Sequence, residues 1–391
     1  MAKQIKNLAE VSERIKQAVK KKEKIILYGD SDVDGATSVI ILKEAIERLG
    51  GEIDYCYFFD RATDGYGLNK PALKFLASRS PALLILVDLG IGNYKEITLA
   101  NKQGFEVIVI DHHKIPEKLP PASLIIDPKQ EDDEYDFKEM TAGGLCYKVA
   151  QLLLREDPEY DFFDRSFVEL ASLSVIADMM PQEKDNADIV VRGLNSLPTT
   201  NRLALQILEE KFAEESPSIL YLSTKIISLL GASRISSSSH KADVFLALST
   251  SQEGKIRRIV KRLEINLVKK HRARDEIVAT IQEKLEGEKN PPLVFGGESF
   301  WSPIALGSAA SRLVKLYGCP IFVYHQGEEE STGSVRCPKN VDSVELMRKC
   351  SKLLITFGGH APASGFRVKN SKLNQFKNCL LKNHDQAIDQ C

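Results

Sequence analysis

Short apolar runs alternate with amphipathic segments through the first third of the chain. Uninterrupted apolar runs bounded by turn residues are typical of strands that are buried on both faces of a sheet. Strands are expected at residues 25–28, 53–59, 83–87, 107–110 and 124–126. Helices are expected before and between them, at residues 8–22, 37–46, 71–78 and 94–103. Strands that alternate with helices predict an α/β domain with a doubly wound, mostly parallel sheet.

Helical patterns dominate the middle of the chain, and the composition changes after Pro291-Pro292. One long helical pattern, with few breakers, covers about residues 252–286. Beyond it, strands at 292–295, 320–324 and 332–336 and a helix near 372–381 indicate a second, smaller α/β domain. The predicted organisation is a main domain at 1–250, a connecting helix at 251–290 and a small domain at 291–391.

Composition places the chain among ordinary globular proteins. Of its 391 residues, 43% are hydrophobic and 27% are charged, and the net charge is −1. With this net charge the chain has no overall positive field that would indicate a nucleic-acid partner. A surface that binds nucleic acid must therefore be a local one. The long helix carries nine Lys and Arg residues between Lys255 and Arg274. This charge is consistent with a helix whose basic face is only solvated. It is also consistent with a helix that flanks the phosphate backbone of a nucleic acid.

The seven cysteines are odd in number and scattered, without a Cys-x-x-Cys pair. This spacing argues against a zinc site and against a disulfide framework, and it favours a reducing cytosol. The N-terminus reads as a polar amphipathic helix without the apolar core of a signal peptide, and no apolar run has the length of a membrane span. We therefore expect a cytoplasmic protein without a membrane partner.

The segment Asp30-Ser31-Asp32-Val33-Asp34-Gly35 carries the first candidate chemistry. It joins a predicted strand to a predicted helix, where ligands gather in α/β sheets. Carboxylates this close resist ionising together unless a cation compensates them. An EF-hand loop would require a glutamate where Ile41 stands, and a strand rather than a helix precedes the segment. A solvated acidic turn that bends at Gly35 is the other alternative.

More polar groups follow later apolar segments. Asp88 ends one predicted strand, Asp111-His112-His113 ends another, and Asp178 ends a helix. Each alone has a structural interpretation, as a helix cap or as a hydrogen-bonded histidine. Together with the first three aspartates, however, they form a set too acidic to assemble without cations. Carboxylates with an imidazole suit Mn²⁺ or Mg²⁺. Two such ions that share a carboxylate would lower the pKa of a bridging water and clamp both sides of an in-line phosphoryl displacement.

With these motifs in order, the sequence resembles the DHH superfamily of phosphoesterases. The motifs are Asp30-x-Asp32-x-Asp34-Gly35, Val87-Asp88-x-Gly90, Asp111-His112-His113 and Ala177-Asp178-x-Met180-Pro181. Two further segments narrow the resemblance to the RecJ-like branch, namely Asp60-Arg61 through Gly65-Tyr66-Gly67-Leu68, and Gly358-Gly359-His360-x-x-Ala363-x-Gly365. The latter is similar to the signature of the associated DHHA1 domain, and the resemblance runs from about Ile25 to Phe366.

The resemblance implies a nuclease that uses two Mn²⁺ or two Mg²⁺ ions on single-stranded nucleic acid. It assigns one ion to Asp30, Asp32 and Asp88. It assigns the other to Asp34, Asp88, His112 and Asp178, with Asp88 shared. His113 would contact the scissile phosphate or stabilise its developing charge. The substrate-binding residues that it implies are Arg234, Ser334, Arg336, Gly359 and His360, and it places the last four in phosphate-handling loops.

The chain departs from the family pattern at several positions. Asp30 stands where many superfamily members have histidine, although the RecJ-like branch also has aspartate there. Of a basic run that precedes the long helix in that branch, only Arg234 is clearly present. Ser302 stands where the family usually has histidine. The chain is also too short to hold the OB-fold of bacterial RecJ proteins, so we expect weaker, more salt-sensitive binding to long strands or a preference for short oligonucleotides.

Three functional hypotheses follow. The first is a metal-dependent exonuclease that releases 5′-mononucleotides from single-stranded DNA or RNA. The second is a phosphodiesterase of short oligonucleotides or cyclic dinucleotides. The third is a non-catalytic replication or repair scaffold, which would bind no stoichiometric Mn²⁺. Replication or repair proteins are the protein partners that such a chain would meet.

Overall fold

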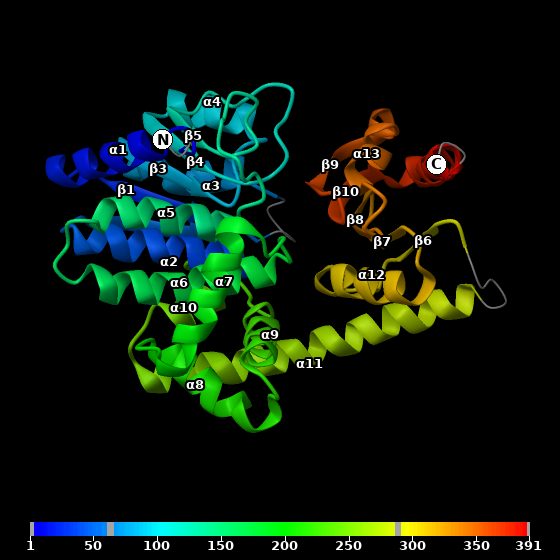
Figure 1. Ribbon diagram of the computed structural model, residues 1–391. Coiled ribbons are helices and arrows are strands. Elements are labelled where there is room, and N and C mark those ends of the chain that lie inside the picture. Colours follow the sequence, from blue (N-terminus) through cyan, green and yellow to red (C-terminus); the bar gives the residue numbers. More distant parts are fainter. Residues whose placement is uncertain (1–3, 61–65, 286–290, 389–391) are drawn as a thin grey trace. The chain divides into compact units, whose positions relative to one another are not determined.

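A computed structural model describes residues 4–60, 66–285 and 291–388, and of His360 and residues 384–388 it describes the backbone alone. The chain divides into two compact units, Met1–Asn266 and Leu267–Cys391. Each unit has its own sheet (Figure 1). The division falls inside the predicted connecting helix, and the predicted domain bounds remain a prediction. Among the described helices, none combines the length and the apolar character needed to cross a bilayer.

The N-terminal unit is built on a five-stranded sheet in the order β2-β1-β3-β4-β5, with every pair parallel. Its strands are β1 (Ile25–Gly29), β2 (Ile53–Phe58), β3 (Ala82–Val87), β4 (Phe105–Ile110) and β5 (Leu124–Ile126). All residues of β1 and β3 are buried, as their continuous apolar sequences require. The expected doubly wound parallel sheet is confirmed.

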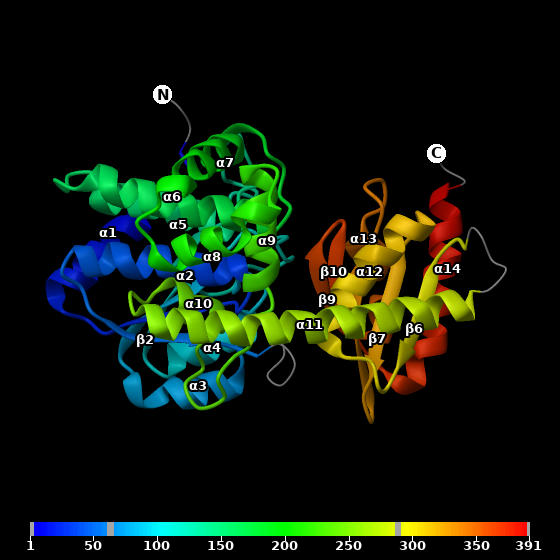
Figure 2. The same ribbon diagram turned by 90° about the horizontal axis from the view of Figure 1, so that it is seen from below.

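Helices cover both faces of this sheet (Figure 2). On one side α3 (Lys70–Leu76) and α4 (Tyr94–Lys102) contribute apolar residues to a core with alternate residues of the strands. The other side carries α1 (Leu8–Lys21), α2 (Val33–Arg48) and α5 (Ala142–Leu154). Outside them α6 (Tyr160–Ala177) packs on α2 and α5, and α7 (Lys184–Ser196) packs on α6. Because α2 is covered all round, twelve of its residues are buried.

The rest of the N-terminal unit is helical. It contains α8 (Leu203–Phe212), α9 (Ile219–Leu230) and α10 (Asp243–Leu248). The long helix α11 (Glu253–Lys284) confirms the predicted helical pattern and belongs to both units. Ile256 and Leu263 are buried in its first half, and Ile277 and Ile281 are buried in its second half.

The C-terminal unit has a five-stranded sheet in the order β6-β7-β8-β10-β9. Its strands are β6 (Val294–Glu298), β7 (Ile321–Gln326), β8 (Glu330–Arg336), β9 (Leu354–His360) and β10 (Ala363–Lys369). Only β6 and β7 pair in parallel, and the other pairs are antiparallel. Helix α12 (Pro303–Tyr317) packs with α11 on one face. On the other face lie α13 (Ser343–Arg348) and α14 (Leu373–Ile388).

Two expectations for this unit are wrong. Cys350 and Cys379 form a disulfide, which joins the end of α13 to α14. The sequence argument against disulfides failed because cysteines 29 positions apart become neighbours only through the packing of two helices. The phosphate-handling segments are also not loops. Ser334 and Arg336 lie on β8, while Gly359 and His360 lie on β9. Their glycines allow close strand approach, since a Cβ at Gly359 would meet the carbonyl oxygen of Ala363 at 2.6 Å.

Candidate metal centre

Strand ends bring half of the predicted metal ligands together. Asp30 follows β1, Asp88 follows β3 and His112 follows β4, and these three strands are adjacent in the sheet. Strand order reverses between β1 and β3, and open parallel sheets bind ligands outside the carboxyl ends of their strands at such a point. The three residues are almost wholly buried, at 0%, 3% and 1% exposure. The sheet topology alone therefore positions half of the predicted ligands.

The other ligands come from helix ends. Asp32 is the N-cap of α2, where its carboxylate accepts a hydrogen bond from the Gly35 amide at 3.1 Å. Asp34 lies in the first turn of α2 and is buried. Asp178 is the C-cap of α6 and keeps 28% of its side chain exposed. The local sequence explains the turn, because a short polar residue at the N-cap satisfies an amide that the helix leaves without a partner.

His112 lies at the centre of the cluster. Its Nε2 atom is 3.2 Å from Asp88 Oδ1, 3.5 Å from Asp34 Oδ2 and 3.7 Å from Asp178 Oδ2. Among the described residues, possible ligand atoms within 4.8 Å of one another form three groups. They are Asp30/Asp32/Asp88, Asp34/His112/Asp178 and Asp88/His112/His113. The first two groups correspond to the two predicted ion sites, and Asp88 lies within reach of both.

Crowding of these carboxylates disfavours their ionisation. Burial raises the pKa of Asp88 well above its ordinary value, and four neighbouring aspartates raise it further. Burial and the charge of Asp178 together raise the pKa of Asp34 to about 7. A cation between these groups would reverse both effects, because it favours the charged form of each carboxylate. The electrostatics of the described residues are thus those of a cation site.

Asp111 belongs to the Asp111-His112-His113 motif, but the sequence analysis assigned it no role of its own. Its Oδ1 accepts a hydrogen bond from His113 Nδ1 at 2.7 Å and another from the His112 amide at 2.8 Å. Its Oδ2 accepts from the Ile91 amide at 3.0 Å. Burial alone would raise the pKa of Asp111, but the charge of His113 and their hydrogen bond hold it below its ordinary value. Asp111 therefore orients the His113 ring.

Tyr66 lies on the other side of the His113 ring. Its hydroxyl is 3.3 Å from His113 Nε2 and 3.3 Å from the Asp88 carbonyl oxygen. Tyr66 belongs to the Asp60–Leu68 motif, of which residues 61–65 lie outside the described residues. The motif had identified a family branch without giving any residue a role. Proximity to His113 gives Tyr66 a place in the site.

The predicted substrate residues of the C-terminal unit form a row across three strands. Arg336 of β8 and His360 of β9 are each paired with Ala363 of β10. Gly307 of α12 lies against this row, since a Cβ there would be 3.1 Å from Arg336 Nη2 and 3.8 Å from Ser334 Oγ. Gly359 is also on this sheet, next to His360.

Two other positions that the sequence analysis singled out, Arg234 and Ser302, lie in segments that connect helices or strands. Arg234 is exposed between α9 and α10, and its amide donates to Asp243 at 3.4 Å. Ser302 is the N-cap of α12. His325 is a spatial neighbour of that position, because its Nδ1 lies 2.8 Å from the carbonyl oxygen of Trp301.

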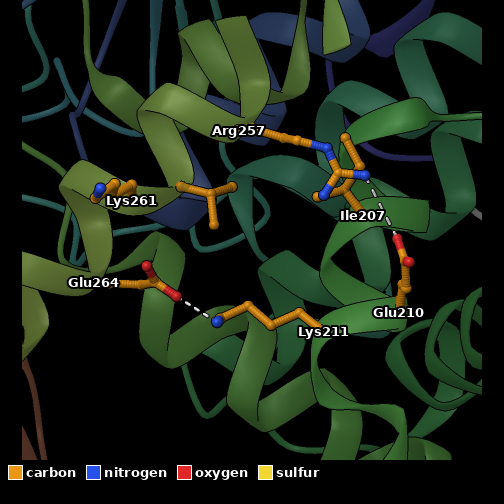
Figure 3. A pocket seen from close by; sticks show the side chains of 7 residues that line it. Ile207, Glu210, Lys211, Arg257, Lys261 and Glu264 are labelled. Atoms are coloured by element: carbon orange, nitrogen blue, oxygen red, sulfur yellow. Dashed lines mark ion pairs between the residues drawn. The ribbon is translucent and has the colours of Figure 1, made fainter. Parts of the chain in front are cut away.

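A groove of about 430 Å³ lies between α8 and α11 (Figure 3). It is lined by Ile207, Glu210, Lys211, Arg257, Val260, Lys261 and Glu264. Lys211 pairs with Glu264 and Arg257 pairs with Glu210 across it. Both ion pairs are largely exposed to solvent, so they contribute little to the packing of the two helices. The groove contains none of the predicted site residues.

Comparison with known proteins agrees with the motifs. A family model described as "DHH family, N-terminal domain" matches residues 24–175, and one described as "DHHA1 domain" matches residues 290–387. The single-stranded-DNA-specific exonuclease RecJ of Bacillus subtilis is 30% identical, over 98% of this chain and 49% of its own length. The chain thus spans about half of this relative, and 54% of the RecJ exonuclease of Thermus thermophilus.

Solved structures share the fold of the whole described chain. An exonuclease RecJ bound to manganese has a TM-score of 0.77 and 24% identity, over 98% of this chain and 95% of that one. RecJ of Thermus thermophilus in complex with Mn²⁺ has a TM-score of 0.81 and 22% identity, over 98% of this chain and 55% of that one. With both domain models matched in order, residues 24–175 belong to the DHH family and residues 290–387, in the C-terminal unit, are a DHHA1 domain.

Proposed function

We propose that this chain is a metal-dependent exonuclease that hydrolyses phosphodiester bonds of single-stranded DNA or RNA to 5′-mononucleotides. The observation that carries the proposal is the pair of ligand groups Asp30/Asp32/Asp88 and Asp34/His112/Asp178 at the carboxyl edge of the parallel sheet. The RecJ relatives described as single-stranded-DNA-specific exonucleases support DNA as the first substrate to test.

Two Mn²⁺ or two Mg²⁺ ions are the proposed cofactors. The donor set fits them, because it consists of carboxylates and imidazole without thiolate. The RecJ structures that hold manganese or magnesium support the same choice. When bound, such ions would activate the attacking water and stabilise the charge of the phosphate.

The chain's own groups would hold and orient the substrate. We assign Asp88 the role of the shared ligand, since it belongs to the group with Asp30 and Asp32, and its Oδ1 lies 3.2 Å from Nε2 of His112, a member of the other group. The hydrogen bond from His113 Nδ1 to Asp111 fixes the ring, and Nε2, on the side of the Tyr66 hydroxyl, would then contact a phosphate oxygen. In the C-terminal unit, Arg336 would bind a phosphate through its planar guanidinium. Ser334, Gly359, His360 and, in the N-terminal unit, Arg234 are proposed to bind further along the strand.

The proposal is tested with single-stranded DNA and RNA of one sequence, labelled at the 5′ end or the 3′ end. Mn²⁺-dependent release of mononucleotides from one end is the expected result, and the labelled end that disappears first gives the polarity. Chains of 2, about 10 and about 40 nucleotides should be compared at two salt concentrations, because phosphate contacts weaken with salt. Cleavage of the dinucleotide alone would instead favour a phosphodiesterase of short oligonucleotides. No cleavage of any substrate, by protein that binds Mn²⁺, would contradict both.

We also infer a cytoplasmic location. It is supported by Cys56, Cys146, Cys319 and Cys337, which are buried and are not joined in disulfides. The Cys350–Cys379 disulfide is the observation against it. Alkylation of the protein in fresh lysate, followed by mass spectrometry, should find Cys350 and Cys379 reduced if the location is correct.

A further inference from the structure

Asp34 is held by an unusual number of protein donors for a residue expected to bind a cation. Its side chain is 2% exposed. Oδ1 accepts hydrogen bonds from Ser174 Oγ at 2.6 Å and from the Gly143 amide at 2.8 Å. Oδ2 accepts one from the Ala142 amide at 3.1 Å. The two amides belong to the first turn of α5, so the positive end of that helix faces the carboxylate.

The two oxygens of Asp34 are therefore not equivalent. Two short bonds engage Oδ1, and Ser38 Oγ adds a longer contact of 3.4 Å to the same atom. Oδ2 has a single, longer bond and lies 3.5 Å from His112 Nε2. Since a carboxylate oxygen has only two lone-pair directions, Oδ1 has none left for a cation, whereas Oδ2 keeps one.

Ser174 packs tightly against the first turn of α5. A Cβ on Gly143 would meet Ser174 Oγ at 2.4 Å and Asp34 Oδ1 at 3.2 Å, so a glycine is required there. Ser174 Oγ is also 2.7 Å from Thr141 Oγ1, and that hydroxyl caps α5 by accepting from the Gly144 amide at 3.0 Å. One hydroxyl thus connects the cap of α5, the end of α6 and the metal-site carboxylate.

We propose that Ser174 is a positioning residue that makes Asp34 a one-oxygen ligand through Oδ2. Ser174 and the Gly143 amide hold Oδ1, which turns Oδ2 toward His112 and Asp178. The inference rests on the proposed function, because it assumes that these three residues share a cation. Partners that orient a metal ligand typically change metal affinity about 10-fold to 100-fold when they are removed.

The test is calorimetric titration of Mn²⁺ into the full-length chain and its variants. Ser174→Ala should weaken the site that contains Asp34 by roughly 10-fold to 100-fold and leave the other site unchanged. Ser172→Ala is the matched control. It removes a buried hydroxyl from the same helix, but one that donates to the backbone carbonyl of Glu169 at 2.8 Å. Ser38→Ala should have an intermediate effect, because its contact with Oδ1 is longer.

The outcomes are separable. Unchanged Mn²⁺ affinity in Ser174→Ala would overturn the positioning role. An equal loss in Ser172→Ala would also overturn it, since the effect would then be a general loosening of α6. Far-UV circular dichroism and the melting temperature without cation show whether each variant is folded. If the unchanged chain binds no Mn²⁺, the proposed function itself fails, and this inference fails with it.

Discussion

At the scale of single residues, the sequence predicts the position of a site residue correctly when that residue directly follows a single strand. Asp30, Asp88 and His112 follow strands, and apolar runs reveal those strands in the sequence. The roles of Asp111 and Ser174 were not predicted, because both depend on contacts that the sequence does not reveal. Ser174 is 140 positions from Asp34. A buried serine in a helix has no sequence signal that separates a ligand partner from core packing.

Asp88→Asn is expected to abolish Mn²⁺-dependent cleavage and to reduce the number of bound ions. Asp88 has a positive φ of 62°, a conformation that asparagine adopts readily, so this variant removes the charge without straining the backbone. Single-turnover cleavage and calorimetric stoichiometry are the measurements. Wild-type cleavage by this variant, at any Mn²⁺ concentration, would exclude Asp88 as the shared ligand.

The pH dependence of stability tests a second buried acid. Asp127 is wholly buried after β5, and its Oδ2 has no hydrogen-bond partner among the described residues. Burial, with the nearby charge of Asp111, raises the pKa of Asp127 from 3.8 to about 8. The folded chain thus keeps a proton that the unfolded chain releases above pH 3.8. The contribution of this group to stability is full below that pH and is lost as the pH rises toward 8.

The measurement is urea unfolding of the cation-free chain between pH 5 and 8. For one such group, the free energy of unfolding falls by at most about 1.4 kcal/mol per pH unit. Asp127→Asn keeps the acceptor that binds the Lys129 amide at 2.9 Å and stays neutral at every pH. The slope against pH should therefore be smaller in the variant. Equal slopes in the two chains would show that Asp127 ionises normally.

At the scale of elements, the prediction was better for the first sheet than for the second. The strands of the N-terminal unit are continuous apolar runs, and all five were expected. The β9–β10 hairpin and α12 were not. Gly358 and Gly359 made β9 resemble a loop, while α12 buries small residues such as Ala305 and Ala309, which give a weak helical pattern. Antiparallel strands that pack partly through glycine have little hydrophobic periodicity to detect.

Gly35→Ala is expected to damage the metal centre through the first turn of α2. A Cβ at Gly35 would lie 2.5 Å from the Asp30 carbonyl oxygen and 2.8 Å from its amide nitrogen. Because both atoms are backbone, the turn must move away from Asp30. We expect a loss of stability of about 1–3 kcal/mol and weaker Mn²⁺ binding.

Gly254→Ala is the control for that variant. It changes a glycine in the first turn of another helix, where a Cβ would meet no atom within 4 Å. This substitution should be neutral, or stabilising by roughly 0.5–1 kcal/mol. Thermal unfolding and calorimetry of the two variants side by side provide the comparison. Equal Mn²⁺ affinity in both would show that the turn tolerates a side chain.

At the scale of the whole molecule, α11 has residues in two cores. Ile256, Ile259 and Leu263 are buried in its first half, before the boundary at Asn266. A chain that ends at the predicted domain boundary, residue 250, would lack them. Burial of one such apolar side chain stabilises a fold by about 1.5–3 kcal/mol, and the shorter fragment loses this contribution for each of the three. We therefore expect residues 1–250 to aggregate or to melt at a clearly lower temperature than residues 1–266.

The comparison of these two fragments uses calorimetric melting and size-exclusion chromatography. Fragment 1–266 contains every residue of the candidate metal centre and should bind Mn²⁺ with the stoichiometry of the full chain. Fragment 1–250 with the same melting temperature would contradict the placement of α11 in the first core. It would support the boundary that the sequence suggested.

The position of Asp178 at the end of α6 has a consequence for biosynthesis. A ribosome releases the chain from its N-terminus, so the strands of the parallel sheet emerge well before α5 and α6. During that interval Asp30, Asp34 and Asp88 are present without the helix amides, the serine hydroxyl and the final ligand that complete their surroundings. Cation binding would thus be a late step in the folding of the N-terminal unit rather than an early one. It could take place before the C-terminal unit is translated.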